Sequence, residues 1–250
     1  PTVLSASTVY TITAINSGGT TTTTITLAVN DVAPSNIVYS PHDMILTKGV
    51  NMGFNDPTVS GGAVDTWEIS PSIATLGLSF SSSTGRISGT PLYKQTTAVT
   101  YTVWANNSGG STSTQVNITI NDPPPHSLSY SPENKTLTKG TAMNQWLPTV
   151  SGGTVDTWEI SPSFNNGLSF NPGLGWITGT PTSLQTTAIT YTVWANNSGG
   201  SISTTINITI NDEVPSISYS PDVFDLTINT VMSPTATPTN SGGAIPSTII

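Results

Sequence analysis

The chain repeats itself at an interval of about 90 residues, and this repeat limits the folds open to it. The segment DTWEISP occurs at residues 65–71 and at 156–162, and YTVWANNSGGS begins at Tyr101 and at Tyr191. An Asn-Asp pair recurs at residues 30–31, 121–122 and 211–212. The interval is typical of whole domains in series, because the units of a solenoid are usually about 20 to 50 residues long.

These markers divide the chain into four segments. Two complete units span residues 32–122 and 123–212. Residues 1–31 match the second half of a unit, and residues 213–250 match the first half. We therefore predict two complete domains with a half domain on each side.

Each unit has the pattern of β-strands. Runs such as AVTYTVW and TQVNITIND alternate apolar and polar side chains, and clusters of Gly, Pro, Ser and Asn separate them. The tetrapeptide NSGG at residues 107–110 lies between two such runs, where its glycines allow a tight hairpin turn. The pattern predicts about seven strands in a unit, packed as a sandwich of two antiparallel sheets.

Two motifs carry a resemblance to a known family. The first unit contains GLSF at residues 77–80 and TGRISGTP at 84–91; the second contains GLSF at 167–170 and GWITGTP at 175–181. In these motifs the chain resembles the immunoglobulin-like repeats of the He-PIG type, related to dystroglycan-type cadherin-like domains, of large prokaryotic surface proteins. The resemblance implies an all-β fold class of tandem immunoglobulin-like β-sandwich domains in a linear array. It also implies a role outside the cell as a spacer, stalk or adhesive module, with no catalytic residues.

Composition narrows the possible partners. The chain has a net charge of -8 and a sequence pI near 4.3, so it lacks the basic surface that nucleic acids and anionic membranes require. Its 45 Thr and 33 Ser favour strands with hydroxyl-covered outer faces. No apolar run approaches the roughly 20 residues of a membrane span, so we expect no membrane insertion within this stretch. The absence of cysteine is compatible with an extracellular or cell-surface protein.

Six aromatic residues are expected to have two different roles. Trp67 and Trp158 alternate with isoleucines, so we predict that they pack in the cores, together with Tyr101 and Tyr191. The remaining pair, Trp104 and Trp194, falls on the opposite strand face, and the aligned residue in the first half unit is a threonine. We therefore expect both to be contact residues on the outer face. Three explanations remain open: packing against a neighbouring domain or subunit, stacking on a sugar, and an ordinary surface tryptophan.

Five Asn-X-Ser/Thr tripeptides are glycosylation candidates: Asn106, Asn117, Asn134, Asn196 and Asn207. Alternation places Asn117 and Asn207 on outer strand faces, where a glycan would fit. The alternative is chance, because the tripeptide is short and the chain is rich in Asn, Thr and Ser.

Metal binding and catalysis have little support in the sequence, and we expect no cofactor. The junction aspartates Asp31, Asp122 and Asp212 are weak calcium candidates, because calcium prefers about six to eight oxygen ligands and few acidic residues lie nearby. A turn or capping role is the alternative. His42 and His126 belong to no nucleophile motif. Lys48 and Lys139 could form isopeptide crosslinks, although the pattern favours surface lysines.

The half units allow two interpretations. Residue 250 corresponds to Ile160 and residue 1 to Pro181, so 20 residues of a normal unit are missing between them. The stretch can belong to a longer continuous array. Alternatively, residues 213–250 of one subunit and 1–31 of the next build a composite domain by strand exchange, which would propagate as a homopolymer.

Together these features predict a structural repeat region of an extracellular surface filament, stalk or giant adhesin, glycosylated and without enzymatic activity. The alternative is a carbohydrate-binding accessory region of a secreted polysaccharide-degrading enzyme. That alternative requires exposed Trp104 and Trp194 rings. An enzyme in its own right would need a concave pocket with converging polar groups.

Overall fold

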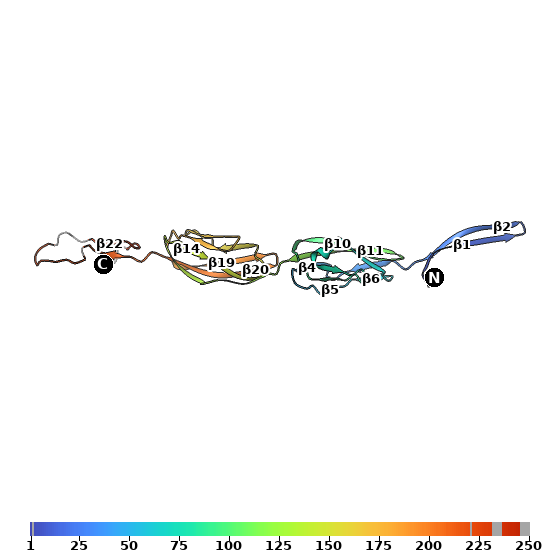
Figure 1. The fold of residues 1–250 in the computed structure, drawn as a ribbon, viewed down its shortest axis with the longest axis horizontal. Coiled ribbons are helices and arrows are strands. Elements are labelled where there is room, and N and C mark those ends of the chain that lie inside the picture. Colours follow the sequence, from blue (N-terminus) through green and yellow to red (C-terminus); the bar gives the residue numbers. More distant parts are fainter. Residues whose placement is uncertain (2, 221, 232–236, 246–250) are drawn as a thin grey trace. The chain divides into compact units, whose positions relative to one another are not determined.

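The structure, a computed structural model, describes residues 1, 3–220, 222–231 and 237–245 (Figure 1). Parts of the predicted last half unit, residues 221, 232–236 and 246–250, therefore lie outside the described residues. The chain divides between Pro123 and Pro124 into two compact units, and each is described by itself.

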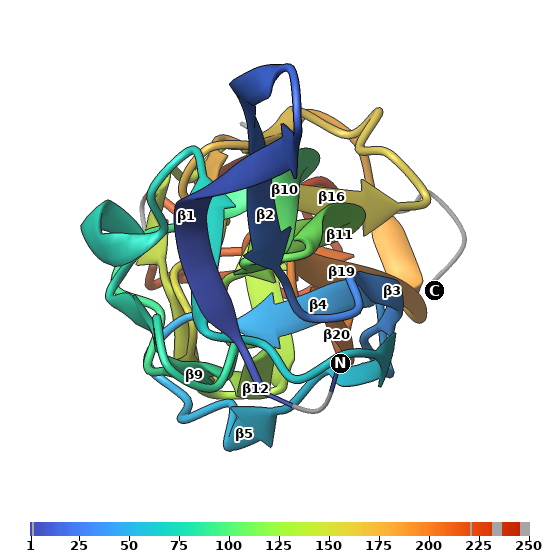
Figure 2. The ribbon, with the colours of Figure 1, turned by 90° about the vertical axis from the view of Figure 1, so that its right-hand side faces the viewer.

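The first unit begins with a two-stranded hairpin, formed by β1 (Ser5–Asn16) and β2 (Gly19–Val29). The two strands run side by side (Figure 2). They are antiparallel, with Tyr10 opposite Ile25 and Thr13 opposite Thr22. Ser17 and Gly18 form the turn between them. We call this element the N-terminal hairpin.

The first complete domain follows in the same unit. Its elements are β3 (Pro34–Val38), β4 (Asp43–Thr47), β5 (Phe54–Asn55), β6 (Thr58–Gly61), β7 (Thr66–Ser70), the short 3-10 helix η1 (Ala74–Leu76), β8 (Leu78–Phe80), β9 (Ile87–Gly89), β10 (Gln95–Asn107) and β11 (Gly110–Asn121). One layer is a four-stranded sheet in the order β4-β11-β10-β7. The three-stranded sheet β5-β9-β8 and the pair β3-β6 make up the rest of the sandwich.

The second domain repeats this topology. Its strands are β12 (Pro125–Tyr130), β13 (Asn134–Thr138), β14 (Met143–Trp146), β15 (Pro148–Gly152), β16 (Thr157–Ser161), β17 (Leu168–Phe170), β18 (Ile177–Gly179), β19 (Gln185–Asn197) and β20 (Gly200–Asn211). The order of the large sheet is β13-β20-β19-β16, equivalent strand by strand to the first domain. After it, β21 (Ile217–Ser218) pairs with β22 (Thr239–Asn240).

Two details differ from the pattern expected from the sequence. Each domain has nine strands among its described residues, more than the seven expected, because strands as short as β5, β8 and β9 are too brief to show alternation. The large sheets are also not purely antiparallel, since β4 runs parallel to β11 and β13 runs parallel to β20. The parallel direction is possible because the chain enters β4 from a different sheet and forms no hairpin with β11.

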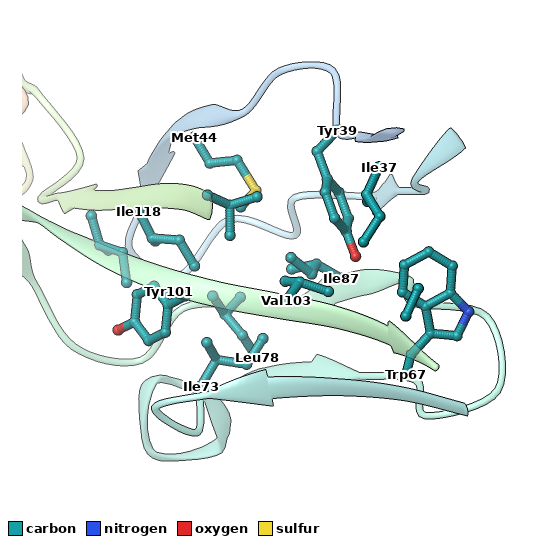
Figure 3. Close-up of a cluster of buried hydrophobic side chains, with 13 residues drawn as sticks. Ile37, Tyr39, Met44, Trp67, Ile73, Leu78, Ile87, Tyr101, Val103 and Ile118 are labelled. Atoms are coloured by element: carbon teal, nitrogen blue, oxygen red, sulfur yellow. The ribbon is translucent and has the colours of Figure 1, made fainter. Parts of the chain in front are cut away.

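The first core lies between the large sheet and the smaller ones (Figure 3). Val103 and Ile87 are fully buried at its centre, and Trp67 and Tyr101 lie toward opposite ends. Complete burial of an aliphatic side chain contributes about 1.5 to 3 kcal/mol, so a cluster of this kind stabilises the domain strongly. The second core has a similar arrangement around Val193 and Ile177, which are also fully buried.

A buried tyrosine hydroxyl links strand and loop in both domains. The Tyr39 hydroxyl donates a hydrogen bond of 2.5 Å to the Gly85 carbonyl oxygen. Tyr130 donates the equivalent bond to the Gly175 carbonyl oxygen. Burial raises the pKa of both phenols well above the usual value, because the charged phenolate would lose its hydration.

The two cores differ at several aligned positions, and the largest change in side-chain volume among them is at Asn55 and Trp146. Trp146 is buried in the second domain, where its ring packs edge-on against Tyr130 with centroids 5.3 Å apart and its indole N–H donates to the Ser131 carbonyl oxygen. Asn55 occupies the equivalent place in the first domain, is also buried, and donates to the Pro41 carbonyl oxygen. The indole and the carboxamide fill the same site with very different volumes.

Candidate binding surface

The outer face of the large sheet carries one half-buried tryptophan in each domain. Trp104 lies in β10 between Val103 and Ala105, both of which point into the core and are fully buried. Because successive side chains alternate across a strand, the indole projects from the outer face. Trp194 occupies the equivalent place between Val193 and Ala195 in β19.

A carboxylate lies directly across from each of these rings. Glu68 on β7 pairs with Trp104, and Glu159 on β16 pairs with Trp194. Directly opposite residues of an antiparallel pair have Cβ atoms about 4.5 to 5.5 Å apart on the same face, so ring and carboxylate are neighbours. Both glutamates are exposed.

An asparagine amide supports each carboxylate. Asn106 Nδ2 donates to Glu68 Oε1 over 3.4 Å, and Asn196 Nδ2 donates to Glu159 Oε1 over 3.0 Å. We call each set of tryptophan, glutamate and asparagine a tryptophan ledge.

The remaining neighbours of the rings on this face are all polar. In strand register, the residues beside Trp104 and Trp194 carry hydroxyls or side-chain amides. They are Thr66, Ser70, Thr102, Ser111, Ser113 and Gln115 in the first domain, and Thr157, Ser161, Thr192, Ser201, Ser203 and Thr205 in the second. Each ledge is therefore one aromatic ring inside a border of hydrogen-bonding groups.

The N-terminal hairpin has no such ledge. Thr13 stands at the position of the tryptophan, and its cross-strand partner is Thr22. The hairpin differs instead on its other face, where Ile12 and Leu27 are about half exposed, at 48% and 52%. Their equivalents in the first domain, Val103 and Ile118, have no exposed surface.

The core aromatic candidates lie inside the two domains. Trp67 and Tyr101 belong to the first core, and Trp158 and Tyr191 belong to the second. Tyr191 also donates from its hydroxyl to Gln185 Oε1 over 3.2 Å. Burial raises the pKa of this phenol, and the hydrogen bond to Gln185 opposes the rise.

The other glycosylation candidates are tied into hydrogen bonds that run across the strands. Asn117 donates to Asp43 Oδ1 over 2.7 Å and accepts a 2.7 Å bond from the Thr100 hydroxyl. In the second domain Asn207 donates to Asn134 Oδ1 over 2.8 Å and accepts from a threonine hydroxyl. These contacts stabilise strand pairing.

Asp122 and Asp212 contact lysines of their own domains, whereas Asp31 contacts a serine of the domain that follows it. Asp122 is buried with its carboxylate oxygens 3.7 Å from Lys48 Nζ and 3.2 Å from Lys94 Nζ. Asp212 lies 4.0 Å from Lys139 Nζ, and Asp31 Oδ2 accepts a bond from a serine hydroxyl. An ammonium group beside a carboxylate opposes cation binding, and the described residues contain no cluster of three or more His, Cys, Asp or Glu suited to a metal.

The histidines lie apart from one another in different domains. His42 Nε2 is 3.2 Å from the carboxylate of Asp43, and both side chains are exposed. The His126 ring nitrogen Nδ1 is 3.1 Å from the Ser127 hydroxyl. Within the described parts of the chain, no helix is long and apolar enough to span a membrane.

Sequence reasoning placed Trp104 and Trp194 on the outer face but did not place Glu68 and Glu159 beside them. The signal was present, because DTWEISP and YTVWANN recur together in both complete units. Alternation within DTWEISP places Glu68 on the face opposite to Trp67. Only the pairing of β7 with β10 brings that face beside Trp104.

Comparison with known proteins supports the fold. The family model described as "Putative Ig domain" matches residues 34–121 and 124–211. No curated protein matches the chain.

Several solved structures are similar. The titin I-band fragment I67–I69 is 18% identical, with 82% of this chain and 75% of that chain covered and a TM-score of 0.40. The insect immune protein hemolin is 13% identical, with 81% and 56% covered and a TM-score of 0.41. Human protocadherin-24 EC1-2 is 12% identical, with 74% and 99% covered and a TM-score of 0.34.

Proposed function

Because the chain belongs to the immunoglobulin-like domain family whose model covers both of its complete repeats, we propose that it is a structural repeat region of an extracellular surface protein. The all-β fold class and the tandem immunoglobulin-like domains expected from the sequence are confirmed. The finer relation to dystroglycan-type cadherin-like domains stays a prediction. The proposed role is mechanical and adhesive, as part of a filament, stalk or giant adhesin, and includes no catalytic step.

The observation that carries the proposal is the repetition of one complete sandwich, strand by strand, with two separate cores. Each domain buries its own apolar residues, so domains of this kind can be added in series without a new core. Their outer strand faces carry mostly hydroxyl and amide groups. A surface covered mainly by hydroxyl and amide groups suits a protein whose role is to connect other domains.

Single-molecule stretching tests the mechanical role. A chain pulled from both ends is expected to unfold in two separate steps, one for each complete domain. Each step should lengthen the chain by about 30 nm, since a residue contributes at most about 3.6 Å when extended. Antibody labelling of intact cells tests the location in parallel. A single unfolding step, or labelling that appears only after the cells are permeabilised, would contradict the proposal.

Strand exchange is the second part of the proposal. In the complete domains, the first half of a repeat covers the apolar face of the long hairpin. Residues 213–250 have that first-half pattern, and Ser218 pairs with Thr239 in the same register as Ser129 with Thr149. Tyr219 is 50% exposed, whereas its equivalents Tyr39 and Tyr130 are buried. We assign the N-terminal hairpin of one copy as the partner of residues 213–250 of another.

The composite would lack the counterparts of β17 and β18, so we expect weak association. Sedimentation of the 250-residue chain at rising concentration should show a growing average mass. The variant Ile12→Asp places a charge on the apolar face and should abolish the growth, while the control Thr13→Asp, on the outer face, should not. A monomer at every concentration, or equal behaviour of both variants, would exclude strand exchange and leave the tandem structural role intact.

A further inference from the structure

We propose that the tryptophan ledge of each domain binds a neutral polysaccharide, with the indole ring against one face of a sugar and the glutamate accepting hydrogen bonds from sugar hydroxyls. This inference goes beyond the structural role proposed above and does not depend on strand exchange. It rests on the strand register, which places polar residues beside Trp104 and Trp194 on the outer face.

The polar residues around each tryptophan ring are better suited to binding a sugar than to binding a protein surface. The centre of a protein interface is usually apolar and poor in charged residues. Here Glu68 and Glu159 lie directly beside the rings, and a protein partner would have to bury these carboxylates. Burial of an ionised carboxylate is costly unless it gains hydrogen bonds. Sugar hydroxyls supply such bonds.

The ledge combines the two features that a pyranose requires. A pyranose presents C–H groups on its faces and hydroxyls around its rim, and an indole is a large apolar surface. An ionised carboxylate has about four lone-pair sites for hydrogen bonds. Asn106 donates to one oxygen of Glu68, Oε1. The other sites can accept hydroxyl donors, and such charge-assisted bonds are the stronger kind.

Charge restricts the class of polysaccharide. The polar neighbours of each ring include one carboxylate and no lysine or arginine. The chain as a whole carries a net charge of -8. Uronate-containing and sulfated chains would therefore be repelled, so the expected ligand is built from uncharged sugars.

Repetition offsets the weakness of a single shallow site. The same tryptophan, glutamate and asparagine recur in both complete domains, and a polysaccharide presents the same sugar many times. Two weak sites on one chain can then hold a long polymer more firmly than either site alone. The Thr13 position of the N-terminal hairpin serves as an internal comparison, because it lacks both ring and carboxylate.

Affinity electrophoresis of the full 250-residue chain tests the proposal. The protein should be made in a host without N-glycosylation, so that Asn106 and Asn196 are unmodified. Native gels containing a β-glucan, a mannan, a galactan or a polyuronate are compared with a gel without polysaccharide. We expect at least one neutral polymer to retard the protein, and the polyuronate to have no effect.

Matched variants assign the retardation to the ledge. Trp104→Thr with Trp194→Thr copies the hairpin sequence, and should weaken binding by about tenfold or more. Glu68→Gln with Glu159→Gln keeps the shape of the side chains and should weaken binding less. The control Tyr93→Ser removes an exposed aromatic outside the ledge and should leave binding unchanged, since Ser183 is its counterpart in the second domain.

Three outcomes would overturn the proposal. One is the absence of retardation by every neutral polymer. Another is retardation that both the tryptophan and the glutamine variants retain, which would place binding elsewhere. The third is a loss of self-association, measured by sedimentation, in the tryptophan variant without any sugar binding by the parent chain, because the ledge would then be a protein contact. The glutamine variant keeps the test valid if the tryptophan variant fails to fold.

Discussion

The long hairpin occurs three times in this chain, and the three copies differ in what covers their apolar face. Their strand pairing is the same, since Tyr10 faces Ile25 in the N-terminal hairpin just as Tyr101 faces Val116 and Tyr191 faces Ile206 in the complete domains. The same turn, centred on a Ser-Gly pair, closes each copy. Register is thus set by the hairpin itself, through its turn and its alternation.

Whether the apolar face of the hairpin is buried depends on the rest of the repeat, which covers that face in the complete domains. The apolar face of the N-terminal hairpin is largely exposed, while the matching residues of the other two copies are among the most deeply buried. A hairpin of two strands has too little apolar contact to be independently stable, and a covering layer supplies it. The three hairpins therefore show that the turn and the alternating sequence are enough to pair the two strands. Stabilising the pair requires tertiary contacts with a covering layer.

A charge on the apolar face should give the largest contrast between these hairpins. Val103→Asp places a carboxylate among fully buried side chains without a partner, and we expect it to unfold the first domain at room temperature. The matched change Ile12→Asp, on the half-exposed face of the N-terminal hairpin, should leave both domains folded. Residue-resolved hydrogen exchange can follow each domain, and protection of β10 in Val103→Asp equal to that of the parent would refute the expectation.

Alkaline pH should give the next largest effect, through the two buried tyrosines of the first-half strands. Burial raises the pKa of Tyr39 and Tyr130 in the folded domains, whereas an unfolded tyrosine ionises near pH 10. Their contribution to stability is therefore complete below about pH 10 and declines as the pH rises further. Denaturant midpoints at pH 8, 10 and 11 measure the decline, and the double variant Tyr39→Phe, Tyr130→Phe should flatten it. A decline of the same steepness in the double variant would assign it to other groups.

The tyrosine hydroxyl itself should give a smaller, local effect. Tyr39→Phe removes the donor to the Gly85 carbonyl oxygen and should destabilise the first domain by about 0.5 to 1.5 kcal/mol. The aligned change Tyr219→Phe, on the half-exposed tyrosine of the last half unit, should change neither domain. Chemical denaturation of both variants measures this difference. An equal loss in both would mean that Tyr219 is packed in solution much as Tyr39 is.

The sequence was sufficient to predict the features that depend on neighbours along the chain. Alternation separates Tyr101 from Trp104, and the turn at residues 107–110 pairs their strand with the next one. The parallel contact of β4 with β11 was not foreseen, because that contact joins residues more than 70 positions apart. The bond from Asn106 to Glu68 depends on a similar distant pairing. Patterns within one sequence say little about pairs of distant strands, because the register of such strands depends on how the whole core packs.

The smallest expected effect distinguishes the two complete domains at acid pH. Arg86 donates to both oxygens of Asp56, at 2.6 and 3.0 Å, and these hydrogen bonds hold the pKa of that carboxyl below its usual value. In the second domain Leu147 and Trp176 occupy the aligned positions. A lowered folded pKa means that the contribution to stability is present above the unfolded pKa, near 3.9 in model peptides, and is lost as the pH falls below it. The first domain should therefore lose slightly more stability than the second between pH 6 and pH 3.

The effect should be modest because both side chains of this pair are partly exposed, and exposed ion pairs contribute little. Residue-resolved hydrogen exchange at the two pH values gives the loss for each domain separately. Arg86→Gln should remove the extra loss in the first domain, and high salt should reduce it, because salt screens exposed charges. If the first domain of Arg86→Gln lost as much stability as that of the parent, the difference between the domains would have to come from groups other than this pair.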